Sequence, residues 1–218
     1  MVIKNTKTRA HTRYISANGD YVVGVSTVLN VLDKPALVAW SNRLGLQGID
    51  STKYKDKMAD IGTITHLRIL HQLKCTTPDL SEYSQADIKA SENCMLSYQS
   101  WFKGHKLEPI CIETPLTSDR YGYGGTPDFI GMVDGRLEIL DYKTGNGIYG
   151  TAFYQVAAYR QLAHELGHRV EHARILRIGR SADEGFEERL ITKFDDEFEI
   201  FLNCLSIYNL LKKTGRRL

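Results

Sequence analysis

The stretch GGTPDFIGMVDGRLEILDYKTG, residues 124–145, decides the fold. Two apolar runs flank Asp134-Gly135, a dipeptide suited to the positive φ angles of a two-residue hairpin turn. If the chain folds symmetrically about that turn, Asp128 lies directly opposite Asp141 on one face of the hairpin. The sequence therefore predicts a tight antiparallel hairpin with two carboxylates side by side.

These carboxylates need a compensating charge. Directly opposite residues have Cβ atoms about 4.5–5.5 Å apart, and carboxylates that close repel unless a proton or a cation lies between them. Oxygen ligands of this kind suit Mg²⁺ or Mn²⁺. Lys143, two residues after Asp141, points to the same face, and the same register places Thr126 opposite Lys143. The pattern predicts a cation site next to an ammonium group.

Strand parity separates Glu138 from this site. Glu138 has the opposite parity from Asp141, so it is expected to project away unless a bulge intervenes. The alternatives for the whole stretch are an exposed hairpin with incidental charges or a simple ion pair between Asp141 and Lys143. The apolar flanking residues disfavour an exposed ribbon.

Composition sets broad limits. The chain has 218 residues, 42% of them hydrophobic and 25% charged, which is typical of a folded globular protein. The formal net charge of +2 gives no argument for nucleic acid, so any basic surface would be local. No apolar run approaches the roughly 20 residues that span a bilayer. The early basic residues favour a mobile basic arm over an organelle transit peptide: Lys4, Lys7, Arg9 and Arg13.

Periodicity predicts a single α/β domain over 1–218, with a hairpin and a largely helical part over 1–105 and a catalytic α/β core over 106–218. An N-terminal pair of strands is expected within 13–29, around Asn18-Gly19. Helices are expected at about 32–45, 54–73, 84–103, 150–166 and 195–213. Strands are expected at 108–114, 121–133, 136–143, 169–178 and 186–192.

The cysteines argue against a cluster or a disulfide framework. Zinc and iron–sulfur sites show short ligand spacings, and disulfide frameworks belong to small secreted chains. The four cysteines are widely spaced and are expected to be reduced, mostly buried thiols: Cys75, Cys94, Cys111 and Cys204.

Four motifs, in order, resemble the PD-(D/E)XK nuclease superfamily and its RecB-like exonuclease branch. They are GTITH at 62–66, GGTPD at 124–128, DYK at 141–143, and a glutamine and a tyrosine spaced by four at 155 and 159. The resemblance covers 62–159 and implies a restriction-endonuclease-like core, with a central mixed β-sheet flanked by helices and a helical N-terminal region. A lone DYK is weak evidence, whereas four ordered motifs are specific.

The resemblance also implies roles for individual residues. The catalytic residues would be Asp128, Asp141 and Lys143, with Lys143 orienting the attacking water and stabilising charge on the phosphate. The implied ligands of Mg²⁺ or Mn²⁺ are His66, Asp128, Asp141, Glu113 and the backbone carbonyl of Tyr142. The implied substrate-binding residues are Gln155, Tyr159, Thr126 and Thr144. Taken alone, His66 would be read as a hydrogen-bonded core histidine, and Gln155 and Tyr159 as ordinary helix surface.

The expected function is metal-dependent hydrolysis of DNA, exonucleolytic, in recombination, repair or phage DNA processing. The alternatives are a structure-specific endonuclease and a non-catalytic nuclease-fold module that binds DNA or docks a partner. DNA is the expected partner, with a helicase or a recombination protein as a further one, and no membrane. The expected location is the cytoplasm of a bacterium or a phage-infected host, with mitochondria left open. Several relatives carry a cysteine-bound iron–sulfur cluster, and the cysteine spacing here predicts none.

One rival motif points to a different enzyme class. HELGH, His164 to His168, matches the zinc-protease pattern in which two histidines share a helix face. Gly167 is expected to end the helix and place His168 off that face. The basic C-terminus would either contact phosphates or complement a helix end, and both interpretations stay open for Lys212, Lys213, Arg216 and Arg217.

Overall fold

The computed structural model describes residues 13–32, 34–181 and 183–215 and shows a mixed α/β fold with two sheets and six helices in that part of the chain. The strands are β1 (Tyr14–Ile15), β2 (Tyr21–Gly24), β3 (Leu107–Ile112), β4 (Leu116–Ser118), β5 (Tyr123–Gly125), β6 (Phe129–Val133), β7 (Arg136–Lys143), β8 (His172–Ile178) and β9 (Phe186–Ile191). The helices are α1 (Val25–Leu29), α2 (Pro35–Leu46), α3 (Ser51–Leu73), α4 (Gln85–Phe102), α5 (Gly150–Glu165) and α6 (Asp195–Thr214). Lys4, Lys7, Arg9, Arg216 and Arg217 of the predicted basic ends lie outside the described residues.

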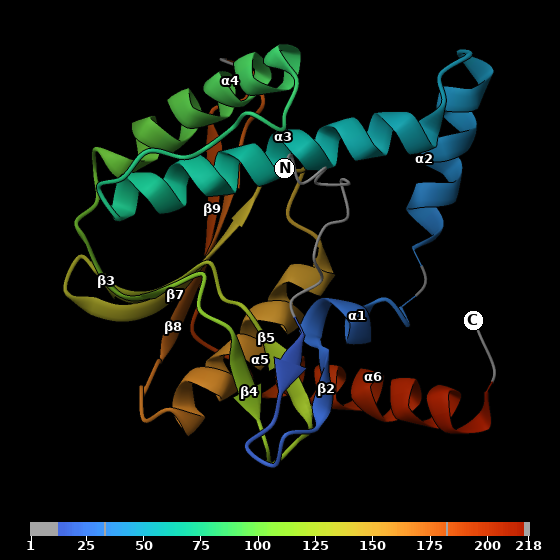
Figure 1. Cartoon of the computed structure of the whole chain (residues 1–218), viewed down its shortest axis with the longest axis vertical. Coiled ribbons are helices and arrows are strands. Elements are labelled where there is room, and N and C mark those ends of the chain that lie inside the picture. Colours follow the sequence, from blue (N-terminus) through green and yellow to red (C-terminus); the bar gives the residue numbers. More distant parts are fainter. Residues whose placement is uncertain (1–12, 33, 182, 216–218) are drawn as a thin grey trace, which may run out of the picture.

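The larger sheet is five-stranded and mixed, in the order β3-β6-β7-β8-β9. Only the β7–β8 pair is parallel, and α5 forms the crossover between these two strands. Helices α3 and α4 cover one face, and α1, α5 and α6 lie on the other (Figure 1). Each face buries its own apolar core, so the sheet is the middle layer of three, as predicted for a restriction-endonuclease-like core.

The β6–β7 hairpin has the predicted register. Asp134 and Gly135 have φ angles of 50° and 81°, so both residues are left-handed, as a type I′ turn requires. The strand partners run from Val133↔Arg136 at the turn to Phe129↔Leu140. One step further along this ladder brings Asp128 beside Asp141.

The single strand expected at 121–133 is wrong. The chain instead forms two short strands in different sheets, β5 and β6, separated by residues 126–128. Pro127 has no N–H to donate to a ladder, so the chain changes sheets there. The expected pairing of Thr126 with Lys143 is therefore also wrong, and Thr126 Oγ1 lies 3.0 Å from the hydroxyl of Tyr14 instead.

The smaller sheet has the order β1-β2-β5-β4, and β2 pairs in parallel with β5. The second N-terminal strand expected to extend through Leu29 ends at Gly24, and α1 follows it. The β-branched residues of α1 favour a strand, but Val25, Val28 and Leu29 are buried together at helical spacing in the core shared with α5 and α6. Tertiary burial overrides local propensity here. The short strand β4 was not predicted.

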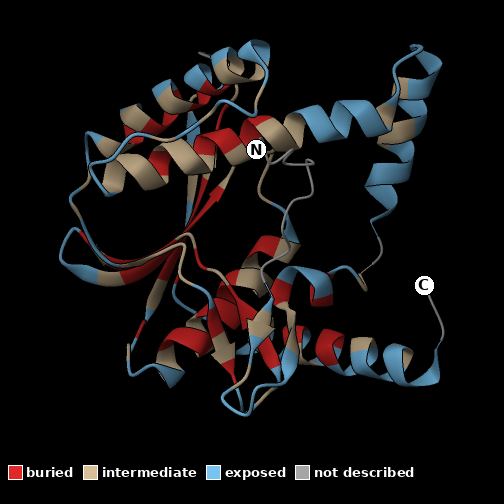
Figure 2. Ribbon diagram, in the orientation of Figure 1, coloured by how far each residue is buried: buried red, intermediate tan, exposed pale blue. Residues whose placement is uncertain are grey.

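The long helices match the predicted ranges within a few residues. Helix α3 begins at Ser51 because the Asp50 side chain accepts hydrogen bonds from the N–H groups of Thr52 and Lys53, at 2.9 and 3.1 Å. The second half of α3 is buried against the sheet, whereas its first half and the whole of α2 extend outward (Figure 2). The buried half carries the motif at 62–66.

Within the described residues, no helix is both long and apolar enough to cross a membrane. All four cysteines are free: Cys94 and Cys204 are buried, Cys111 is half-buried and Cys75 is exposed.

Candidate active site

The site lies where β6 begins and β7 ends. Because the two strands are antiparallel, the start of β6 and the end of β7 lie at the same end of the hairpin. Asp128 immediately precedes β6, Asp141 and Lys143 close β7, and α3 passes beside them. The end of β3 also lies here, so the β6–β7 hairpin, α3 and β3 together contribute to one corner of the molecule.

Three side chains at this corner form a group that could hold a metal ion. His66, Glu113 and Asp128 each offer one ligand atom, and these atoms all lie within 4.8 Å of one another. His66 Nδ1 lies 3.1 Å from Asp128 Oδ1 and 3.8 Å from Glu113 Oε1. An imidazole with two carboxylates is a donor set that suits a divalent cation.

Glu113 is held in a strained backbone conformation. Its φ angle is 49°, in the left-handed region that non-glycine residues seldom adopt, at a cost of about 1–3 kcal/mol. Its N–H donates to the carbonyl oxygen of Asp128 at 3.2 Å, and the β3–β6 ladder shifts register between Pro109 and Cys111. The irregular end of β3 thus places this carboxylate next to the other two candidate ligands, His66 and Asp128.

The charges in this group shift one another's pKa values. Burial alone would lower the pKa of His66, but the negative charges of Asp128 and Glu113 outweigh burial and raise it to about 10. Burial would raise the pKa of Asp128, but His66, Lys143 and the Tyr142 N–H together hold it below its usual value. A protonated imidazole therefore balances the carboxylates, and a divalent cation would compete with that proton for the same ligands.

Asp141 and Lys143 form a close but incomplete pair. Lys143 Nζ lies 2.6 Å from Asp141 Oδ2, yet this buried oxygen accepts no well-formed hydrogen bond from any described residue. Burial, reinforced by the charge of Asp128 and opposed by Lys143, raises the pKa of Asp141 to about 6. Asp141 lies outside the group of His66, Glu113 and Asp128, so its role as a ligand stays a prediction.

A chain of hydrogen bonds holds Lys143 from the other side. Its Nζ donates to Gln155 Oε1 at 2.9 Å, and Gln155 Nε2 donates to the Tyr159 hydroxyl at 2.7 Å. Gln155 and Tyr159 are four residues apart on α5 and share one helix face. Of the predicted substrate-binding pair, Gln155 thus contacts the predicted catalytic lysine directly, and Tyr159 is linked to it through Gln155.

The motif glycines have a steric explanation. A Cβ atom on Gly62 would lie 2.7 Å from Thr144 Oγ1, so only glycine lets α3 approach the end of β7 this closely. His66 follows one helical turn later, and this approach brings its ring to Asp128. A Cβ atom on Gly125 would lie 2.5 Å from the Tyr159 ring. The glycines therefore set the spacing of the elements that carry the candidate functional side chains.

The contacts in this structure do not test the roles that the resemblance implies for Tyr142 and Thr144. The Tyr142 N–H donates to Asp128 Oδ2 at 2.7 Å, which fixes that carboxylate, but the proposed role of the Tyr142 carbonyl stays a prediction. Thr144 contacts the position of Gly62, and its binding of substrate also stays a prediction. Sequence reasoning missed Tyr14, which holds Thr126 across 112 residues of chain, a separation that leaves no local signal.

Glu138 lies away from the site, as its strand parity predicted. It is fully buried and accepts hydrogen bonds from Arg174 at 3.1 and 3.3 Å. Both guanidinium contacts are on the α4 side of β7, opposite the face of Asp141.

The zinc-protease interpretation fails on geometry. Helix α5 ends at Glu165, and Gly167 has a φ angle of 88°. The His168 N–H donates to the Ala163 carbonyl at 3.0 Å, a Schellman motif that places His168 beyond the helix, as predicted. His164 Nε2 contacts the carbonyl oxygen of Val170 at 2.9 Å, so the two histidines do not share a helix face.

No family model and no curated protein matches the chain. Among solved structures, it is similar to the alkaline exonuclease LHK-Exo from Laribacter hongkongensis, in its complex with dAMP, at 13% identity over 73% of this chain and 91% of that one, with a TM-score of 0.40. It is also similar to a candidate exonuclease from Eubacterium rectale, at 14% identity over 74% of this chain and 69% of that one, with a TM-score of 0.46. Likeness at this level carries no argument about chemistry, which rests on the site itself.

Proposed function

We propose that this protein is a divalent-metal-dependent deoxyribonuclease of the PD-(D/E)XK type and of its RecB-like exonuclease branch. The observation that carries the proposal is the convergence of His66, Glu113 and Asp128 within 4.8 Å, beside the Asp141–Lys143 pair. The ligand types and the neighbouring ammonium group together match the needs of phosphodiester hydrolysis.

The donor set fits a divalent ion. Carboxylates and a neutral imidazole bind Mg²⁺ or Mn²⁺, and the buried, under-satisfied Oδ2 of Asp141 leaves a carboxylate oxygen with spare accepting capacity. The residues that would hold the ion are His66, Asp128, Asp141, Glu113 and the carbonyl of Tyr142. Such an ion lowers the pKa of a water molecule and neutralises phosphate charge.

Lys143 would act on the substrate itself. Its ammonium group is partly exposed and held between Asp141 and Gln155, so it is fixed in direction while still accessible. A positioned cation of this kind stabilises charge that develops on the phosphate oxygens in the transition state. Tyr159 restrains Gln155 and so limits the movement of the lysine.

We further propose that the protein cleaves DNA from its ends. We also propose that it acts in recombination, repair or phage DNA processing. Both proposals rest on the resemblance of the four motifs. The same resemblance underlies a helicase or recombination protein as a partner and a single nuclease domain over 1–218. A structure-specific endonuclease uses the same chemistry. The intact set of Asp128, Asp141 and Lys143 supports turnover over a module that only binds DNA.

The test is a time course with the purified protein on end-labelled linear single-stranded and double-stranded DNA and on covalently closed circular DNA. We expect linear DNA to be degraded with Mg²⁺ or Mn²⁺, EDTA to stop the reaction, and circular DNA to survive. Cleavage of circular DNA would show that the activity is endonucleolytic and not exonucleolytic. Absence of cleavage of every form with either metal would contradict the proposed function.

A further inference from the structure

A cavity of about 600 Å³ lies beside the candidate active site and shares Tyr159 with it. Its walls come from the β1–β2 hairpin, the start of α1 and one side chain of α5. The volume is in the range of small-ligand pockets, roughly 300–1,000 Å³. The lining residues that matter here are Arg13, Tyr14, Tyr21, Ser26, Thr27 and Tyr159.

Two of these residues connect the cavity to the candidate catalytic groups. Tyr159 lines the cavity while its hydroxyl accepts the hydrogen bond from Gln155, which in turn binds Lys143. Tyr14 lines the cavity while its hydroxyl contacts Thr126, two residues before Asp128. A strand with a phosphate at Lys143 would therefore have this cavity next to it.

One wall of the cavity is tightly packed. A Cβ atom on Gly24 would lie 2.9 Å from the Tyr14 ring, and one on Gly124 would collide with the same ring. The ring thus packs over two glycines that are paired on adjacent strands, and its hydroxyl lies within hydrogen-bonding distance of the Thr126 hydroxyl. A wall that is already ordered loses little conformational entropy when a ligand binds.

Another part of the lining is exposed and chemically distinctive. Tyr21 is 67% exposed, and the Arg13 guanidinium lies 5.6 Å from the centre of its ring. Exposed aromatic rings with a neighbouring arginine are the groups on which single-stranded nucleic acids bind, since bases stack on rings and guanidinium groups bind phosphates. The hydroxyls of Ser26 and Thr27 add neutral hydrogen-bonding groups.

We propose that this cavity is a subsite for one unpaired nucleotide of the DNA strand, with its base stacked on Tyr21 and its phosphate bound by Arg13. The inference rests on the proposed function, because it takes DNA as the ligand. A paired base would have to leave its duplex to enter, whereas a single-stranded base enters without that penalty. The protein therefore prefers single-stranded DNA or single-stranded ends over blunt duplex ends.

The test measures binding in EDTA, so that cleavage plays no part. The probe is a short fluorescent oligothymidylate, compared with a blunt duplex of the same length. We expect tighter binding of the single strand, and Tyr21→Ala to weaken it about 5- to 150-fold, the range of a lost base stack. Arg13→Ala should weaken it as well, whereas Tyr21→Trp should keep the stacking. A 2-aminopurine placed in the oligonucleotide should be quenched by the wild type and not by Tyr21→Ala.

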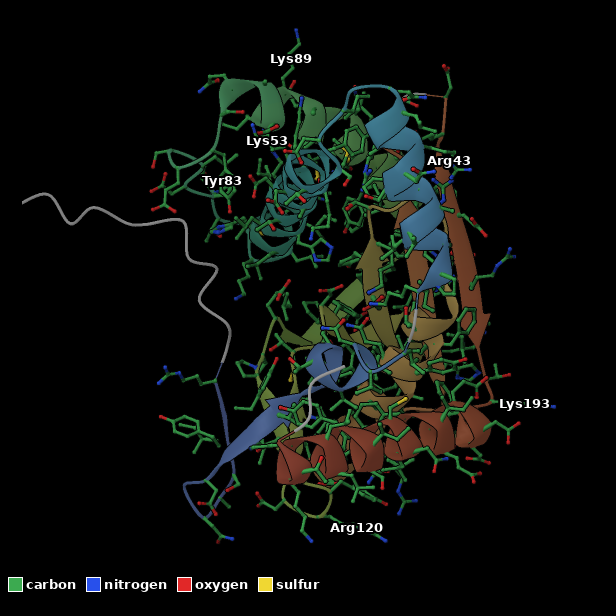
Figure 3. The ribbon with its side chains drawn as sticks, turned by 90° about the vertical axis from the view of Figure 1, so that its right-hand side faces the viewer. Arg43, Lys53, Tyr83, Lys89, Arg120 and Lys193 are labelled. Carbon is green, nitrogen blue, oxygen red and sulfur yellow. The ribbon has the colours of Figure 1, made fainter. Side chains whose placement is uncertain are left out.

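The matched control is Arg120→Ala. Arg120 lies on the turn between β4 and β5, at the lower edge of Figure 3, and its guanidinium lies 5.1 Å from the Tyr121 ring without lining the cavity. This variant should bind the single strand like the wild type. Wild-type affinity in Tyr21→Ala, equal affinity for both DNA forms, or no binding of the single strand would each overturn the subsite. If the wild type binds through Tyr21 but cleaves no DNA with either metal, the proposed function fails and the subsite stands.

Discussion

Strand β7 carries two buried ion pairs, one on each face, and they differ in how completely they are satisfied. Arg174 donates two hydrogen bonds to Glu138 and a third to Glu188, and Arg174 and Glu138 are almost fully buried. On the other face, Lys143 contacts Asp141 at 2.6 Å without satisfying its buried Oδ2, and the lysine is 29% exposed. The saturated pair suits a structural role, whereas the unsaturated pair has capacity left for a cation and a substrate.

The largest expected effect comes from breaking the saturated pair. Glu138→Ala leaves the Arg174 guanidinium with a buried, partly unpaired charge, so we expect the free energy of unfolding to fall by about 3 kcal/mol or more, measured by urea denaturation. Arg189→Ala removes the more exposed pair with Glu187 on β9 and should change the free energy of unfolding by less than about 1 kcal/mol. Equal, small changes in both variants would contradict a structural role for Glu138.

The unsaturated pair should respond in the opposite way. Lys143→Met keeps the apolar stem and removes the ammonium group, so we expect DNA cleavage to slow by about 10²–10³-fold, with little change in the melting temperature. Stability is retained because the Asp141 carboxyl, whose pKa is already about 6, becomes protonated more readily without the lysine. Lys193→Met changes a remote exposed lysine just before α6 (Figure 3) and should cleave at the wild-type rate. A large loss of stability in Lys143→Met would contradict this difference, because it would show that the Asp141–Lys143 pair is also structural.

One added methyl group should increase the distance between α3 and the end of β7. Gly62→Ala places a Cβ atom against Thr144 Oγ1, so we expect α3 to shift and the affinity for Mn²⁺ to fall about 10- to 100-fold, as for other changes that misplace a ligand. Thr144→Ala in the same chain removes that oxygen and should restore the affinity, as measured by calorimetric titration.

Gly45 provides a control that distinguishes the steric effect of Gly62→Ala from the higher helix propensity of alanine. Gly45 of α2 has open space around it, so Gly45→Ala should leave Mn²⁺ affinity unchanged and add up to about 1 kcal/mol of stability. Unchanged Mn²⁺ affinity in Gly62→Ala would show that the glycine does not position His66.

The smallest effect is expected from the outer hydrogen bond of the lysine relay. Tyr159→Phe removes the hydroxyl that holds Gln155, so the cleavage rate should fall about 2- to 10-fold, the equivalent of one hydrogen bond of about 0.5–1.5 kcal/mol. Tyr154→Phe, on the same helix, should keep the wild-type rate in the same assay. A wild-type rate in Tyr159→Phe would show that the Tyr159 hydroxyl does not help to position Lys143.

The central hairpin could be predicted from sequence because its information is local. Asp134-Gly135 defines a two-residue turn, that turn defines the register, and the register places Asp128 near Asp141. Parity then separates Glu138 from the site without any knowledge of the rest of the fold.

The neighbouring regions could not be predicted in the same way, because their conformation depends on distant contacts. The β-branched residues of α1 form a helix only because that helix buries Val25, Val28 and Leu29 against α5 and α6. The run at 121–133 divides between two sheets, and β5 takes its parallel partner β2 from a segment about a hundred residues away. Tyr14, which joins the cavity to the candidate active site, depends on the same long-range pairing.

The measurement that tests the central claim most directly is the initial rate of DNA hydrolysis as a function of Mn²⁺ concentration, for the wild type and for Asp128→Asn. Asp128 contacts both His66 and the Tyr142 N–H, so the variant keeps the size of the side chain while removing the charge at the centre of the group. We predict that the wild-type rate rises with Mn²⁺ to saturation and falls to background in EDTA, and that Asp128→Asn stays near background at every concentration. Hydrolysis that persists in EDTA, or the same Mn²⁺ dependence in Asp128→Asn as in the wild type, would contradict the account.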